Sequence, residues 1–451
     1  MADSAVQTEI AALQEQVARD HEALRKASLN GQKLMMLCLK MNQKLNLMME
    51  MAKNAVESVP MGPSNEAVVA EQPLMCGFMN IKAKNERNWK RRWFVLRKGA
   101  LAYYNDQNAT TPKGTIPLAV CVVDGLKVRD NMQRPCMALV VEGRTLYCEA
   151  ETKKDNVAWF LAINCMQQQL DYSRKLEAQG IEPDTRILAF FDHPLRTELA
   201  LDDVSLSVEA ITSMESTIRF HSALVSLSMQ SAALRDEHVE SLARALSGNK
   251  FLQTVRLGSN DLGPAAAASL AVALEKNAVI TELNLAGNHI GDDGVLALAN
   301  ALGSRPPLAV LDLSDNEVTD EGFAHFVDTL VTESYPLPAL EFSSNAITSA
   351  GVVGSLVPAL GALPSLTRVA LASNAVDDAG VAAILGALPS SSLRELVLSN
   401  NPYAHEQHVE ALLASLLATS SLVLIDMVPV VLDEQSIATL RLLRDNDALA
   451  L

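Results

Sequence analysis

The chain has 451 residues, of which 37 are basic and 53 acidic, giving a net charge of −16; at ~100 to 200 residues per domain, this length predicts two to four domains. Apolar residues make up 49% of the chain and aromatic residues 4%, which excludes a largely disordered chain and predicts cores built from Leu, Val and Ala. The acidic balance excludes nucleic-acid binding by the chain as a whole, because phosphate binding draws on clustered Lys and Arg.

Charge is unevenly distributed along the chain. Residues 74–171 hold 15 basic and 9 acidic side chains, a net charge of +6, whereas residues 196–451 hold 12 and 31, a net charge of −19. A basic module therefore precedes an acidic one. Opposite signs on two neighbouring folded units predict two different binding partners.

Neither the ends of the chain nor its cysteines indicate export, lipidation or a metal site. The first residues do not form a cationic-then-apolar signal, and the last residues offer no prenylation Cys. The six cysteines show no C-x-x-C or Cys/His ligand spacing, so we expect reduced thiols and neither a metal nor a cofactor. The expected location is the cytoplasm, with peripheral attachment to a membrane or to the cytoskeleton as a further expectation.

Residues 1–58 carry a heptad pattern that predicts a helical arm. Between residues 6 and 55 two rows with a spacing of seven are mainly apolar and are interrupted by Gly31 and Asp20. Such a stripe predicts a coiled coil, and a second copy of the chain would give a homodimer through residues 6–55. The alternative is a long amphipathic helix that packs on its own chain. Two prolines and a glycine then end the helix, and residues 59–73 are expected to form a linker.

From residue 224 onward the chain repeats the pattern L-x-x-L-x-L-x-x-N at intervals of 27 to 29 residues. The eight units start at Leu224, Leu252, Ile280, Leu308, Leu337, Leu366, Leu393 and Leu422. The six middle units have Asn at the ninth position, whereas the first has Ala232 and the last has Val430. Each unit predicts a strand, a turn and a helix, and the two deviating units predict caps.

This pattern resembles the leucine-rich repeat family, in the ribonuclease-inhibitor-like class of about 28 residues per unit. The resemblance implies an α/β solenoid, a horseshoe with a parallel sheet on its concave wall and helices outside, over residues 224–451 in eight units. Residues 172–223 are expected to form a connector and the N-terminal cap. The recurring Asn leaves the strand where backbone groups are buried, and its amide can both donate to them and accept from them.

Residues 74–171 read as short strands followed by one helix. Segments 77–81, 88–96, 99–104 and 113–118 are strand-like, and Trp159 lies in the helical pattern that follows. These segments resemble a pleckstrin homology (PH) domain, which implies a β-barrel capped by its C-terminal helix. The family keeps a Trp in that helix to plug the barrel.

The resemblance also implies a site for phosphoinositide headgroups. Phosphate ligands in the family converge from the first strands and their loops, and Arg is suited to this task because its planar fork donates two hydrogen bonds to one phosphate. The matching positions in this chain are Arg92, Arg87, Lys90, Tyr103 and Lys113. The chain departs from the family at Ile81, where the first-strand base is expected; alternation places Lys82 and Lys84 on the other face unless the strand bulges or ends. The alternative is that Lys90 to Arg92 is a solvated strand edge.

The concave wall of the repeats is predicted to bind a protein. The residues assigned to it are Glu282, Asp312, Glu341, Arg256, Arg368 and Glu395. This mixed but mildly acidic set favours a basic protein partner, and ordinary solvated side chains are the alternative. Acidic pairs such as Asp292-Asp293 recur where each helix begins and are expected to complement helix dipoles and caps.

The combination predicts a non-enzymatic adaptor that binds a protein through the repeats and associates weakly with anionic, phosphoinositide-containing membrane through the PH-like module. No nucleophile motif or phosphate-binding loop occurs. One alternative is a GTPase-activating protein, because the repeats resemble those of the Ran-activator family; Arg235 is the early-loop arginine this would need. Another is an actin-regulatory scaffold, because PH followed by leucine-rich repeats resembles actin-capping regulators of the CARMIL type.

Overall fold

The computed structural model describes most of the chain beyond residue 72. The described residues are 73–84, 88–127, 136–193, 196–303, 308–403, 422–427 and 430–432. The predicted arm (1–58), its homodimer contact (6–55) and nearly all of the linker (59–73) lie outside the described residues. Within these ranges no helix is both long enough and apolar enough to cross a membrane.

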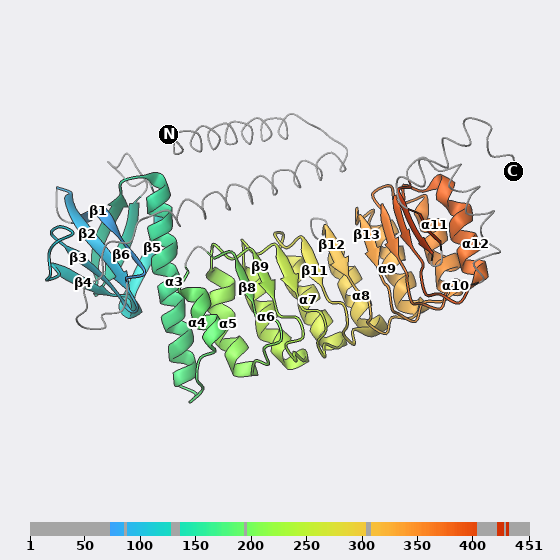
Figure 1. Cartoon of the computed structure of the whole chain (residues 1–451), viewed down its shortest axis with the longest axis horizontal. Coiled ribbons are helices and arrows are strands. Elements are labelled where there is room, and N and C mark those ends of the chain that lie inside the picture. Colours follow the sequence, from blue (N-terminus) through green and yellow to red (C-terminus); the bar gives the residue numbers. More distant parts are fainter. Residues whose placement is uncertain are drawn as a thin grey trace. The chain divides into compact units, whose positions relative to one another are not determined.

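The first part of the described chain forms a curled antiparallel sheet of seven strands (Figure 1). Its strands are β1 (Met75–Ala83), β2 (Lys90–Arg97), β3 (Ala100–Tyr104), β4 (Gly114–Pro117), β5 (Cys121–Lys127), β6 (Cys136–Val141) and β7 (Arg144–Ala150). The order across the sheet is β4-β3-β2-β1-β7-β6-β5, with a 3₁₀ turn, η1 (Leu118–Val120), between β4 and β5.

Helix α3 (Lys153–Glu177) covers this sheet and continues beyond it. Thr152 caps its first turn by accepting a hydrogen bond from the backbone of Asp155. Trp159 is 2% exposed and packs edge-on against Phe94, with ring centroids 6.3 Å apart. The structure therefore places the predicted helical Trp in the core of the sheet, although the helix runs past the expected end of the module at residue 171.

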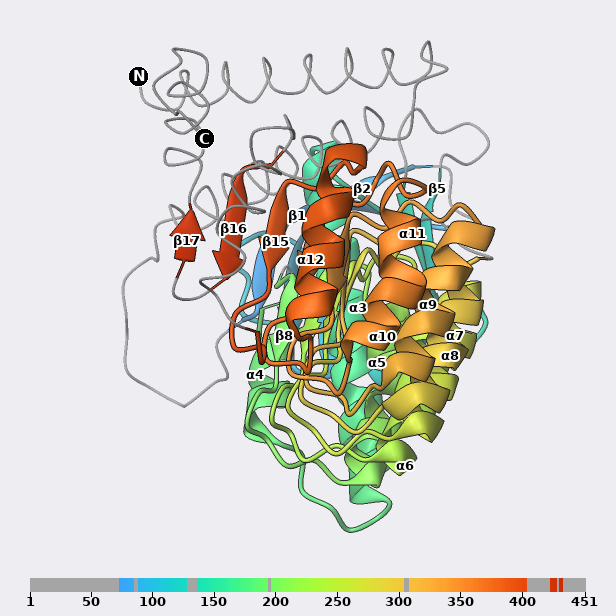
Figure 2. The same ribbon diagram turned by 90° about the vertical axis from the view of Figure 1, so that its right-hand side faces the viewer.

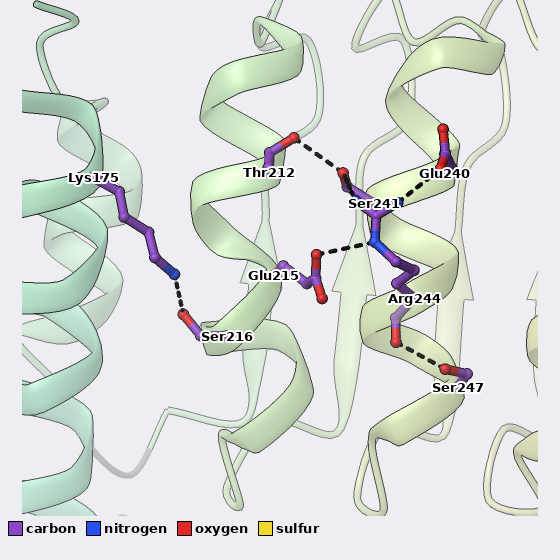
Figure 3. Close-up of polar contacts among 8 residues, drawn as sticks. All are labelled: Lys175, Thr212, Glu215, Ser216, Glu240, Ser241, Arg244 and Ser247. Carbon is purple, nitrogen blue, oxygen red and sulfur yellow. Dashed lines mark hydrogen bonds and ion pairs between the residues drawn. The ribbon is translucent and has the colours of Figure 1, made fainter. Parts of the chain in front are cut away.

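The second half of α3 packs against the segment that leads into the repeats. This segment contains α4 (Thr185–Phe191), β8 (Glu198–Ala200) and α5 (Val208–Phe220). Ser216 of α5 accepts from Lys175 at 3.1 Å and donates to Asp171 at 2.7 Å, both on α3. The polar contacts continue from α5 to α6 (Asp236–Gly248), where Arg244 reaches Glu215 (Figure 3).

The remaining strands form one ten-stranded sheet in which order follows the sequence. The strands that follow β8 are β9 (Ser226–Ser228), β10 (Thr254–Arg256), β11 (Glu282–Asn284), β12 (Val310–Asp312), β13 (Ala339–Glu341), β14 (Arg368–Ala370), β15 (Glu395–Val397), β16 (Leu424–Met427) and β17 (Val430–Leu432). Strands β8 to β16 pair in parallel, and β17 returns antiparallel to β16. Each of the eight predicted units thus contributes one parallel strand, β8 adds one before them, and the antiparallel β17 is a second strand of the last unit.

The helices of the repeats form one layer against one face of this sheet (Figure 2). After α6 they are α7 (Pro264–Lys276), α8 (Gly291–Leu302), α9 (Asp320–Thr332), α10 (Ser349–Gly351), η2 (Val352–Leu356), α11 (Val357–Leu360), α12 (Asp378–Ala387) and η3 (Leu388–Ser390). The π-helical turn η2 ends at Leu356, two residues before Pro358, whose missing N–H and bulky ring disfavour an ordinary helical turn.

The recurring Asn side chains join successive units. In Asn316, which is fully buried, the amide nitrogen donates to the carbonyls of Leu285 and Ser314 at 3.0 and 2.8 Å. Its amide oxygen accepts from the backbone N–H of Ile290 at 3.3 Å. The same pattern recurs at Asn260, Asn288, Asn345, Asn374 and Asn401. The predicted double role of this amide as donor and acceptor is observed.

A second set of contacts joins the starts of neighbouring helices. The carboxylate of Asp292 accepts from the backbone and hydroxyl of Thr319, the capping residue of the next helix, at 2.8 and 2.5 Å. Asp320 binds Thr348 in the same way. A Cβ at Gly322 would lie 2.9 Å from the Cα of Asp292, so glycine permits the close approach. The acidic pairs therefore bind the next unit as well as lying in the first turn of their own helix.

Candidate functional site

The rim site consists of Lys90, Arg92, Tyr103 and Lys113, the predicted headgroup ligands that the structure describes. β1 and β3 end, and β2 and β4 begin, at the same end of the sheet, because neighbouring strands are antiparallel. This topology brings residues from two strands, β2 and β3, and from the β3–β4 loop together at that end. Arg87, the fifth predicted ligand, lies outside the described residues.

Lys90 and Arg92 project from the core-facing side of β2. Lys90 lies opposite Ile81, and Arg92 lies opposite Met79. Directly opposed residues of antiparallel strands point to the same face, and both partners on β1 are buried. Lys90 is exposed and Arg92 is partly exposed, so both bases lie where the core face opens to solvent.

Tyr103 on β3 and Lys113 in the loop before β4 complete the rim site. Tyr103 lies opposite Phe94 on β2 and opposite Gly114 on β4. A Cβ at Gly114 would fall inside contact distance of the Tyr103 ring, 2.7 Å from Cε1, so glycine lets the ring lie over β4. The backbone N–H of Lys113 donates to the Tyr103 carbonyl at 2.8 Å. Its side chain is exposed.

The first strand supplies no base to this face. β1 continues to Ala83 without a bulge, so Ile81 stays on the core side and Lys82, opposite Tyr147 of β7, lies on the outer side. The ammonium of Lys82 lies 5.9 Å from the centroid of the Trp89 ring, within cation–π range. The alternation expected from the sequence is therefore observed for Lys82.

Arg91 differs from its two basic neighbours. It lies opposite Asn80 on the outer face of the sheet. Its guanidinium forms an ion pair with Glu151 at 2.5 Å and sits 3.8 Å above the ring of Phe78. The basic triplet at 90–92 is thus divided between two faces, with the middle residue already engaged outside the rim site.

On the sheet of the repeats, the predicted protein-binding residues contact one another. Arg368 lies between Glu341 and Glu395 and forms an ion pair with each at 2.5 Å. Burial raises the pKa of Glu341, and the hydrogen bond from Arg368 opposes this shift. The one positive and two negative charges of this triad leave a net charge of −1, and its ion pairs join three successive strands.

The other wall residues form two smaller contacts. Arg256 pairs with Glu282 at 2.8 Å. Asp312 accepts a hydrogen bond from the side chain of Asn284 at 2.9 Å and lies opposite Glu341 in the register. Asp312 also accepts from the backbone N–H of Ser314 at 3.0 Å, so both of its hydrogen bonds named here come from uncharged groups.

Arg235 is the early-loop arginine that the GTPase-activating alternative would need, and the cysteines are expected to be reduced thiols. Arg235 forms an ion pair with Asp261 at 3.3 Å, and both side chains are exposed. Burial raises the pKa of Cys121 to about 11 and that of Cys165 to about 12. These thiols therefore stay protonated at neutral pH, whereas thiolates are the reactive form.

Comparison with known protein families agrees with this division of the chain. Residues 73–166 match the PH domain family. Segments 248–271, 276–299, 306–323 and 362–385 match the leucine-rich repeat family. Both kinds of domain are typically non-catalytic.

The curated relatives share one region with this chain. Human pleckstrin homology domain-containing family A member 7 is 31% identical over 122 residues, which cover 21% of this chain and 11% of that protein. Mouse switch-associated protein 70 is 33% identical over 92 residues, covering 20% and 15%. Human Rho GTPase-activating protein 25 is 35% identical over 97 residues, covering 20% and 15%. The chain thus spans a small fraction of the length of these relatives.

Solved structures show partial similarity. The C-terminal PH domain of pleckstrin in complex with an inositol pentakisphosphate is 26% identical, with 21% of this chain and 95% of that chain covered and a TM-score of 0.19. Leiomodin-1 actin-binding site 2 is 21% identical, with 26% and 68% covered and a TM-score of 0.25.

Proposed function

The chain carries a PH domain followed by leucine-rich repeats, and we propose that it acts as an adaptor. Its PH domain docks weakly on anionic, phosphoinositide-containing membrane, and its repeats hold a protein partner. The location that follows is the cytoplasm with peripheral attachment to membrane.

The observation that supports the membrane half is the rim site. Lys90 and Arg92 project from the core-facing side of β2 toward solvent, beside Tyr103 and Lys113. Convergent Lys and Arg donors suit phosphate groups, because charge-assisted hydrogen bonds are the strong ones. Ile81 in place of a first-strand base removes one such donor, so the contact is weak and salt-sensitive.

Weak sites gain from being linked. If residues 6–55 associate two copies, two PH domains face one membrane, and linked weak sites gain ~10² to 10⁴ in avidity without a new contact. The arm and the PH domain then act together.

The protein-binding half rests on the wall of the parallel sheet. Ion pairing within the wall leaves Asp312, hydrogen-bonded to Asn284, as its least neutralised acid. A basic segment of a protein partner fits this position.

Two adjacent arginines test the membrane half. We expect Arg92→Ala to abolish sedimentation of the full chain with vesicles of phosphatidylcholine and phosphatidylinositol bisphosphate. Arg91→Ala is the matched control, because it removes the same charge from the outer face, where Arg91 pairs with Glu151. Equal losses in both variants, or no sedimentation of the unaltered chain, would contradict a specific rim site.

Two aspartates test the protein half. Proteins captured by the full chain are compared between wild type, Asp312→Arg on the wall and Asp328→Arg on the exposed side of α9. We expect a wall-bound partner to be lost only from Asp312→Arg. A capture pattern that all three chains share would contradict docking on the wall.

A further inference from the structure

The loop between β3 and β4, residues 105–113, contains a sequence feature that the rim site does not use. The chain has 18 prolines, and Pro112 is the one that follows a Ser or Thr. Thr111 and Pro112 are both exposed. The whole sequence therefore holds a single Thr-Pro step, and the structure presents it to solvent.

The loop that carries Thr111 begins with a defined turn. Asp106 accepts from the backbone of Asn108 at 2.9 Å, which closes an Asx-type turn at the start of the loop. Proline disfavours helical backbone at the residue before it, and Thr111 lies in a bend of this loop, before β4 begins at Gly114. Protein kinases of the proline-directed class recognise this combination of a hydroxyl followed by proline.

Thr111 lies next to the rim site. It is two residues from Lys113, whose backbone is fixed to Tyr103 at 2.8 Å. Strand β4, which begins at Gly114, is two strands from β2, the strand that carries Arg92. Two strand spacings are ~10 Å, about one Debye length at physiological salt. Charge placed at Thr111 therefore lies beside Lys113, one of the bases of the rim site.

We propose that Thr111 is a phosphorylation site for a proline-directed protein kinase and that its phosphate releases the PH domain from anionic membrane. In the reaction the Thr111 hydroxyl oxygen forms a bond to the γ-phosphorus of ATP. The bond from that phosphorus to the β,γ-bridging oxygen breaks, ADP leaves, and the hydroxyl proton passes to solvent. This regulation rests on the proposed membrane function of the rim site.

The sign and size of the effect follow from charge. A phosphothreonine carries a charge of about −2 at neutral pH, set against the net +6 of residues 74–171. Each base near an anionic surface strengthens binding about fivefold, so offsetting two of them weakens binding by about 25-fold. The new phosphate also competes with lipid phosphates for Lys113.

The experiment combines kinase treatment with vesicle binding of the full chain. A purified proline-directed kinase and ATP are expected to modify Thr111, as mapped by mass spectrometry, and Pro112→Ala and Thr111→Ala are expected to prevent this. The modified chain should bind phosphatidylinositol bisphosphate vesicles about 25-fold more weakly, and Thr111→Glu should mimic part of the loss. Ala382→Glu, on the exposed side of α12, adds the same charge elsewhere and should leave binding unchanged.

The outcomes separate the two ideas. If the unmodified chain does not bind vesicles, the membrane function fails. If it binds, but the kinase leaves Thr111 unmodified or the modified chain binds equally well, the phosphorylation switch fails while the membrane function stands.

Discussion

The PH domain and the repeats use charged side chains in opposite ways. Among the repeats, Arg368 is held between Glu341 and Glu395, and Arg256 is paired with Glu282. In the PH domain Arg91 pairs with Glu151 on the outer face, Arg92 donates to the carbonyl of Arg91, and the rim site keeps its bases at the solvent-facing end of the sheet. Charge in the repeats joins units, whereas charge at the rim faces outward.

This difference shows that net charge alone is a poor guide to a binding surface. The repeat region is far more charged, at −19 against +6 for the PH domain, but much of its charge lies at helix starts or in ion pairs between units. Many of its polar side chains therefore stabilise the packing of one repeat unit on the next. Substitutions in the repeats should act on stability, and substitutions in the rim site should act on binding.

The largest expected effect comes from the segment that leads into the repeats, where the ring nitrogens of a buried histidine have no hydrogen-bond partner in the described structure. His221 is 3% exposed, and neither ring nitrogen has a hydrogen-bond partner in the described structure. Burial lowers its pKa from 6.5 to about 4. As the pH falls, the unfolded chain therefore binds a proton at His221 near pH 6.5, whereas the folded chain binds it only at about pH 4. The free energy of unfolding is therefore unaffected by His221 above pH 6.5, and it decreases as the pH falls toward 4, by about 3 kcal/mol in total.

Urea unfolding at neutral pH and at pH ~5 measures this effect. His221→Phe keeps a ring against Phe190, whose centroid is 4.9 Å away, and should flatten the acid dependence. An acid-induced loss of the same size in both chains would assign it to other groups.

The second effect tests whether the Asn side chains hold the units together. Asn316→Ala leaves the buried carbonyl of Leu285 and the N–H of Ile290 without the side-chain partner that Asn316 provides. We expect a loss of ~1 to 3 kcal/mol in the free energy of unfolding. Asn300→Ala on the exposed side of α8 is the control. An unchanged denaturation midpoint for Asn316→Ala would count against the role of this ladder.

The third effect compares the two regions directly. Arg368→Ala leaves the half-buried carboxylates of Glu341 and Glu395 without their shared cation, and we expect a loss of about 1 kcal/mol, modest because the side chains are partly solvated. Arg92→Ala should change stability by less than about 0.5 kcal/mol while abolishing vesicle binding. Thermal melting and sedimentation of both variants measure the contrast. Lost stability in Arg92→Ala would make the rim base structural.

Periodicity explains how much of the fold could be predicted from the sequence. The spacing of Leu and Asn predicted all eight unit strands, because one buried face repeats in every unit. Strand alternation also placed Lys82 away from the rim site. Identification of the headgroup ligands and of the wall as a binding surface remains a prediction.

Contacts between elements far apart in sequence could not be predicted in the same way. The helix of the PH domain runs on to Glu177 because Tyr172 and Leu176 are buried beyond the sheet. The sequence indicated acids at helix starts, but not that Asp292 would bind the next unit's Thr319. Pairing within the wall, as at Arg368, likewise depends on side chains from three different units.

The smallest expected effect concerns the left-handed backbone conformation of the residue before each recurring Asn. The residue before each recurring Asn has a positive φ, and it is Ser259, Gly287, Asp315, Ser344, Ser373 or Asn400; Ser231, before Ala232 of the first unit, shares this φ. At Ser344, φ is 57°, a conformation that strains a residue with a Cβ and that glycine adopts freely. The one unit with glycine, at Gly287, shows that the turn accepts it.

Ser344→Gly should therefore raise the free energy of unfolding by about 0.5 kcal/mol, the relief of strain less the extra flexibility of glycine in the unfolded chain. Ser343→Gly is the matched control, because φ at Ser343 is not positive. The same substitution there should lower the free energy of unfolding by ~0.5 to 1 kcal/mol. Urea denaturation of both variants gives the comparison. Changes of the same sign would mean that the left-handed turn is not strained, and that its recurrence in the described units with Asn depends on the Asn contacts alone.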